Sequence, residues 1–213
     1  MLHSTREYQM SRNMNTRRSL YIICLLLLSA VGNKLDAQTV VKSVRQANDS
    51  TNHALIHQIG FDVRPGYVAP TNSFLEGDNA QRQKIDRSLS LHLKYAFQFS
   101  KDSYLGRLYP HAYQGIGVSH NTFYNSAELG NPVAVYAFQG APIVRLSSCL
   151  SLDYEWNFGA SFGWKQYDEH SNWYNDAIGS KINAYINLGF VLNWQFYPQW
   201  KLAAGVDFTH FSN

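Results

Sequence analysis

The sequence predicts an all-β protein, an antiparallel transmembrane β-barrel, and three observations support this prediction. From about residue 55 onward, apolar and polar side chains alternate with the period of two that is typical of strands. The alternating runs are long and one-sided, which suits a barrel whose outer face meets lipid and whose inner face lines a polar lumen. No long apolar run that could form a spanning helix follows residue 31, and only helices and closed barrels satisfy their backbone polar groups in a bilayer. A soluble exported sandwich is the alternative, but its strands are usually shorter, about five or six residues.

Composition excludes other classes of protein. Charged residues make up 15% of the chain and the formal net charge is +3, which is too small to indicate a nucleic acid or another polyanion as partner. Of the two cysteines, Cys24 lies in an apolar stretch near the N-terminus. Cys149 therefore has no partner for an intrachain disulfide once that stretch is removed.

The N-terminus has the pattern of a secretory signal peptide. The Arg17–Arg18 pair precedes the apolar run 20–31, and a polar stretch then leads to the small residue Ala37. We place cleavage after Ala37, so residues 1–37 are the predicted signal peptide, with Met14 as an alternative start. An uncleaved anchor is disfavoured because a spanning helix needs about 20 apolar residues. The mature chain is therefore expected to be exported.

Residues 38–54 are polar and irregular, and we interpret them as a lead-in to the barrel. The tight turn Tyr197-Pro198-Gln199 separates the last two predicted strands. The strand at 113–120 is broken by glycine, and the strand at 132–144 is apolar on both faces, which leaves its register ambiguous. The strands predicted by alternation lie, in order, at residues 58–67, 88–99, 113–120, 132–144, 150–165, 182–196 and 200–212.

Aromatic side chains gather at the ends of these strands, as in the interfacial girdles of membrane barrels. They are Tyr67, Phe99, Trp164, Trp194, Phe196 and Trp200.

The strand count predicts an incomplete barrel. Alternation gives about seven strands, whereas single-chain bacterial outer-membrane barrels have even numbers from about eight upward. The last strand also reaches the final residue without a closing turn. We therefore expect residues 55–213 to form an outer-membrane barrel that lacks its last, C-terminal strand.

Several polar groups resemble catalytic motifs but have a simpler interpretation. Gly159 to Gly163 matches the G-x-S-x-G pattern, which requires a sharp strand-to-helix turn around the serine. Ser161 instead lies within a long predicted strand, so the match is interpreted as a coincidence on a small-residue inner face. Asp153, Glu155 and Lys165 are expected to line the lumen. Asp168-Glu169-His170 lies in the polar loop 166–179 without further ligands at metal-binding spacing, and no metal or cofactor is predicted.

His210 and Ser212 are the strongest candidate site. They share one face of the last strand with the apolar stripe Leu202, Ala204, Val206 and Phe208. Ionisable groups on a lipid-facing stripe are costly and often functional. Residues two apart in a strand are about 6–7 Å apart at Cα, so the histidine could activate the serine hydroxyl as a general base. A strand that has simply reached the headgroup level is the alternative, and the pattern alone leaves both open.

The chain resembles the PagL-type lipid A 3-O-deacylases, which are often labelled acyloxyacyl hydrolases. The resemblance covers most of the mature chain, and the H-x-S-N ending is its most specific part. The residues that carry it are Arg64 to Val68, Pro70 to Leu75, Gly130-Asn131-Pro132, Tyr154 to Trp164, Ala177 to Ser180, and Phe208 to Asn213.

The resemblance implies an eight-stranded outer-membrane barrel with catalytic groups on its outer surface. It implies Ser212 as nucleophile, His210 as general base and Asn213 as an oxyanion donor, in a serine esterase that removes an ester-linked acyl chain from lipid A of lipopolysaccharide without a cofactor. The family's third catalytic residue is a glutamate on the strand after the H-x-S strand, and this sequence ends before it. The sequence as it stands is therefore expected to be inactive.

Two other functions remain open at this stage. One is a different outer-membrane lipid acyl hydrolase or acyltransferase, such as a phospholipase. The other is a non-enzymatic structural or adhesive barrel in which His210 and Ser212 are merely interfacial.

Overall fold

The computed structural model describes residues 39–44 and 55–212, with the backbone alone for 39–44. The predicted signal peptide, Met14, Cys24 and Asn213 lie outside these residues. No helix among the described residues is long and apolar enough to cross a membrane. The strands are β1 (Thr39–Val44), β2 (Ile56–Tyr67), β3 (Arg87–Gln98), β4 (Tyr113–Thr122), β5 (Gly130–Arg145), β6 (Leu150–Trp164), β7 (Ile182–Tyr197) and β8 (Trp200–Ser212).

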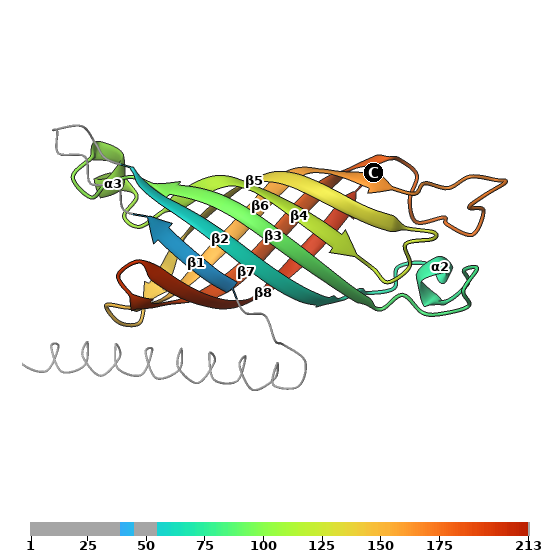
Figure 1. Cartoon of the computed structure of the whole chain (residues 1–213), viewed down its shortest axis with the longest axis horizontal. Coiled ribbons are helices and arrows are strands. Elements are labelled where there is room, and N and C mark those ends of the chain that lie inside the picture. The colour runs from blue at the N-terminus through green and yellow to red at the C-terminus, as the bar shows by residue number, and fades with distance from the viewer. Residues whose placement is uncertain (1–38, 45–54, 213) are drawn as a thin grey trace, which may run out of the picture. The chain divides into compact units, whose positions relative to one another are not determined.

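The strands form one antiparallel sheet in chain order that curls into a barrel (Figure 1). Neighbouring strands from β2 to β8 pair over most of their length, and β1 pairs with both β2 and β8. The all-β antiparallel prediction is confirmed, and each of the predicted strands corresponds to one of β2 to β8. The tight turn after Tyr197 is also present.

The eighth strand comes from a segment that was expected to be an irregular lead-in. β1 takes residues 39–44 out of that segment and closes the barrel. Alternation therefore identified β2 to β8 but missed β1, because a run of six residues beside polar neighbours gives little alternation to detect. Counting strands consequently provides no argument for another one.

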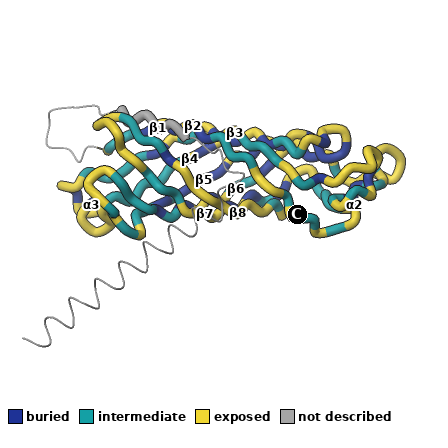
Figure 2. The backbone as a smooth tube through the Cα atoms, turned by 90° about the horizontal axis from the view of Figure 1, so that it is seen from below, coloured by how far each residue is buried: buried dark blue, intermediate teal, exposed yellow. Residues whose placement is uncertain are grey.

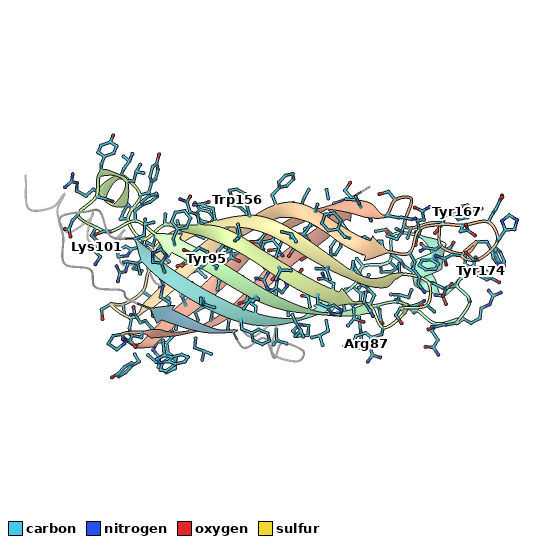
Figure 3. All side chains as sticks on the ribbon, turned by 45° about the horizontal axis from the view of Figure 1, so that its top comes forward. Arg87, Tyr95, Lys101, Trp156, Tyr167 and Tyr174 are labelled. Carbon is cyan, nitrogen blue, oxygen red and sulfur yellow. The ribbon has the colours of Figure 1, made fainter. Side chains whose placement is uncertain are left out.

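Large apolar side chains cover the outer face. Tyr95 and Trp156, each 42% exposed, project from it, as Figure 3 shows. Buried and exposed residues alternate along the strands, as the tube in Figure 2 shows. An apolar surface this extensive is unusual for a soluble monomer.

Two short helices lie in the connections between strands. Helix α2 (Ser73–Glu76) begins where the Asn72 side chain accepts a hydrogen bond from the Leu75 N–H, and helix α3 (Tyr104–Leu108) follows Ser103 in the same way. Serine and asparagine are favoured at this position because their side chains satisfy a free N–H at the helix start. Helix α2 and loop 165–181 lie at one end of the barrel, and α3 lies at the other (Figure 1).

One predicted outward residue faces inward. Trp164 is only 6% exposed and its Nε1 donates to Ser161 Oγ at 2.8 Å. Gly163 has φ +88°, and the pairing of β5 with β6 shifts between Gly130 and Val133. This irregularity turns the side chain into the barrel, so the assignment of Trp164 to the aromatic girdle was wrong.

Candidate functional site

The predicted pair lies at the end of β8 on the outer face. His210 is paired with Ile186 of β7, and Ser212 is paired with Ala184. Both His210 and Ser212 are exposed. Among the described residues neither side chain makes a hydrogen bond, so the two are placed on one face but are not joined. Because Thr209 and Phe211 contact residues of the inner side, alternation along β8 places His210 and Ser212 on the outer face.

The inner face of the same strand is held by polar contacts. Asp207 accepts hydrogen bonds from Asn187 Nδ2 at 3.0 Å and from Arg64 at 3.0 Å. Thr209 Oγ1 accepts from Asn187 Nδ2 at 2.8 Å. Asp207 and Thr209, on the opposite face of β8 from His210 and Ser212, therefore link β8 to β7 and, through Arg64, to β2.

Among the described residues, the other edge of β8 is unpaired along its second half, which leaves a seam between β8 and β2. Strand β1 pairs with β8 from Trp200 to Ala203, and it pairs with β2 only as far as Phe61. The described residues thus provide no partner on this side for 204–212, nor for the facing part of β2. Asp207 points inward, yet its side chain is 29% exposed, as expected for a residue beside an opening.

Among the described residues, the neighbours of the pair on the outer face come from β7 on one side and, across the seam, from β2 on the other. On the β7 side, the outer-face neighbours of the pair are Ile186 and Ala184, which carry no titratable group. On the seam side, β2 presents Val63, Pro65 and Tyr67 outward. Among the described residues, no carboxylate stands beside His210 on the outer face.

The lumen contains a charged network that the sequence reasoning did not assemble. Arg64 contacts Asp62 at 2.6 Å, Asp207 at 3.0 Å and Glu155 at 3.5 Å. Lys94 contacts Glu155 at 2.7 Å and Asp62 at 3.4 Å. Alternation places all five side chains on the inner face of the sheet. The sequence therefore predicts that they point into the barrel, but it does not predict which of them form ion pairs.

The other residues that resemble catalytic motifs in the sequence have structural roles. Ser161 is fully buried inside β6 and donates to the Asn183 carbonyl at 3.0 Å, which confirms the interpretation of its G-x-S-x-G match. Glu155 and Asp153 are buried on the inner face, as expected. Lys165 was expected to line the lumen, but it is exposed and its Nζ donates to the Ala127 carbonyl at 2.9 Å, because β6 ends at Trp164.

The acidic loop forms a local turn. Asp168 Oδ1 accepts hydrogen bonds from the Ser171 hydroxyl and from the backbone N–H groups of Ser171 and His170. These bonds hold the pKa of Asp168 below its usual range. Within the described part of the chain, no group of three or more His, Cys, Asp or Glu residues is arranged to hold a metal ion.

Comparison of the chain with protein-family models, with curated proteins and with solved structures finds no match.

Proposed function

We propose that this protein is an outer-membrane serine ester hydrolase that removes an ester-linked acyl chain from lipid A. The observation that carries the proposal is the placement of His210 and Ser212 on the apolar outer face of β8. A base and a hydroxyl on that face would meet an acyl ester within the membrane rather than a soluble substrate. The resemblance of the H-x-S-N ending to PagL-type deacylases supports 3-O-deacylation as the reaction.

The connections between strands support an orientation in which the pair meets the outer leaflet. β8 ends on the side of connections 68–86, 123–129 and 165–181, whereas the opposite side has connection 99–112, which contains α3, and the turns 146–149 and 198–199. The two longest of these connections, 68–86 and 165–181, are therefore on the side where β8 ends. Outer-membrane barrels have short periplasmic turns and longer extracellular loops. The pair then lies in the leaflet that holds lipopolysaccharide.

The chemistry follows the logic of serine esterases. Ser212 Oγ attacks the acyl carbonyl carbon while His210 accepts the hydroxyl proton, and His210 then returns the proton to the departing sugar oxygen. Water, deprotonated by His210, then attacks the carbonyl carbon of the acyl-enzyme; the bond to Ser212 Oγ breaks, the fatty acid leaves, and His210 returns the proton to Ser212 Oγ. No cofactor takes part in these steps.

The general base needs an orienting acid, and among the described residues the second half of the edge of β8 that faces away from β7 is free to pair with a strand that carries one. Loss of the orienting acid lowers turnover by about 10⁴-fold in a well-studied triad. The reading frame after residue 213 is therefore informative. A further alternating strand with an outward Glu or Asp supports the esterase, whereas a strand that is wholly apolar outside contradicts the triad.

The decisive experiment is mass spectrometry of lipid A from cells that express the complete reading frame. We expect lipid A from these cells to lack one ester-linked acyl chain. In cells that express Ser212→Ala or His210→Gln, we expect lipid A to keep this chain. Ser148→Ala is the matched control, because this serine is exposed in the turn 146–149 at the other end of the barrel and should leave the acyl pattern of the active protein unchanged. Unchanged lipid A with folded protein would leave the structural barrel as the function, and loss of a phospholipid chain would favour the phospholipase alternative.

A further inference from the structure

Phe211 stands between His210 and Ser212 in the sequence and points in the opposite direction. Its ring lies 4.9 Å from the Trp164 ring, 5.5 Å from the Tyr185 ring and 6.1 Å from the Phe123 ring, measured between centroids. These partners come from β6, β7 and the 123–129 connection. The inner side chain of the H-x-S triplet is thus surrounded by aromatic rings from three segments.

Phe211 also joins two apolar clusters that are otherwise separate. It packs against the lumen cluster and against the loop-end cluster. The lumen cluster consists of Ala96, Ala134, Tyr136, Phe138 and Tyr185. The loop-end cluster consists of Phe74, Ile85, Leu129 and Trp164.

The loop-end cluster connects this ring to the surface loops. Phe74 belongs to helix α2 and is fully buried, and Ile178 and Tyr174 of loop 165–181 pack against the same cluster. Helix α2, loop 165–181 and Phe211 therefore pack against the same cluster, so a change in the loops is expected to affect the position of Phe211.

The end of β8 depends on this packing more than an interior strand would. Residues 204–212 have a described strand partner on the β7 side alone. A strand held along one edge can rotate about that edge, and any rotation swings its outward side chains. An inward ring that is packed on several sides opposes the rotation, and it does so at the position between the two candidate catalytic residues.

Building on the proposed function, we propose that Phe211 is the positioning residue of the His210–Ser212 pair. It fixes the direction of both outward side chains by locking the strand between them into the loop-end and lumen clusters. Because interiors are close-packed, the loss of the ring would not be filled by small adjustments. A misplacement of about 1 Å can lower a catalytic rate by about 100-fold.

The test compares Phe211→Ala with Phe138→Ala in the full-length protein. Phe138 is a matched control, since it is 2% exposed in the lumen cluster but its ring contacts Tyr113, Tyr136 and the Lys94 ammonium, none of which is on β8. The first readout is backbone hydrogen exchange by mass spectrometry, which does not depend on activity. The second is kcat and KM for lipid A deacylation, with Phe211→Leu as the conservative variant.

We expect Phe211→Ala to speed exchange at residues 209–212 and to lower kcat by about 100-fold with little change in KM. Phe211→Leu should recover most of kcat, and Phe138→Ala should leave exchange at 209–212 and kcat per folded molecule unchanged. Equal exchange at 209–212 in both alanine variants, or an unchanged kcat in Phe211→Ala, would overturn the proposal. If exchange rises as expected but the unsubstituted protein has no esterase activity, the positioning role stands and the proposed function fails.

Discussion

Replacing Arg64 with methionine should destabilise the barrel by about 3 kcal/mol, the lower end of the range for breaking a buried ion pair. The side chain of Arg64 is 16% exposed, and those of its partners Asp62 and Glu155 are 4% and 5% exposed. Methionine keeps much of the apolar volume but removes the charge, so buried carboxylates lose a cation that they cannot replace with bulk water.

The contacts indicate how the cost divides among the three carboxylates. Glu155 keeps Lys94 at 2.7 Å, and Asp207 is 29% exposed and can be hydrated. Asp62 keeps Lys94 only at 3.4 Å while it loses Arg64 at 2.6 Å. Most of the destabilisation should therefore come from Asp62, and adding Asp62→Asn to Arg64→Met should recover part of it.

Urea unfolding in detergent, followed by tryptophan fluorescence, measures this difference. Arg82→Met is the control, because Arg82 and its partner Asp78 have side chains that are 67% and 59% exposed. An exposed pair of this kind contributes less than about 1 kcal/mol. If Arg64→Met lowers the free energy of unfolding by no more than Arg82→Met does, water screens the charges in the lumen. That result would refute the reasoning about buried charge.

Two further substitutions test close packing and loop order. In Gly159→Ala, the added Cβ would lie 2.0 Å from the Val135 carbonyl oxygen and 2.6 Å from the Tyr136 Cα, so β5 and β6 must separate at a cost of about 1–3 kcal/mol. An unchanged urea midpoint would contradict this close approach. Asn175→Ala removes hydrogen bonds to the carbonyls of Glu128 and Lys165 at 2.8 and 2.9 Å. Protease should therefore cut loop 165–181 faster, while the urea midpoint of the barrel should fall only slightly, because a loop can open without unfolding the barrel. Glu169→Ala, in the same loop with an exposed side chain, should be cut at the unsubstituted rate.

Alternation predicted the strands and their faces because it reports the local environment of each side chain. The strand predicted at 150–165 is β6 at Leu150–Trp164, and the strand predicted at 182–196 is β7 at Ile182–Tyr197. The outward direction of His210 and Ser212 followed from the same alternation. These features depend on neighbouring residues alone, so a single sequence contains them.

Features that depend on distant segments were not predicted. β1 is a strand because β2 and β8 are available to pair with it, and its own six residues contain little of that information. Trp164 turns inward because Gly163 adopts a positive φ opposite an irregular stretch of β5. The network around Arg64 joins β2, β6 and β8, and which of their inward residues meet is decided by the curvature of the sheet.

Within the described residues, the unpaired edges of β2 and β8 along the seam also constrain how this protein can associate with itself. β2 and β8 flank the seam and both run toward the end that bears α2 and loop 165–181. Two copies with the same orientation in a membrane would therefore offer each other edges that run in one direction, and parallel pairing is the less stable kind. A strand of opposite direction fits between them with antiparallel pairing on both sides. Strand polarity thus favours a complementary segment over a second copy at this edge, which is a form of protection against edge-to-edge aggregation.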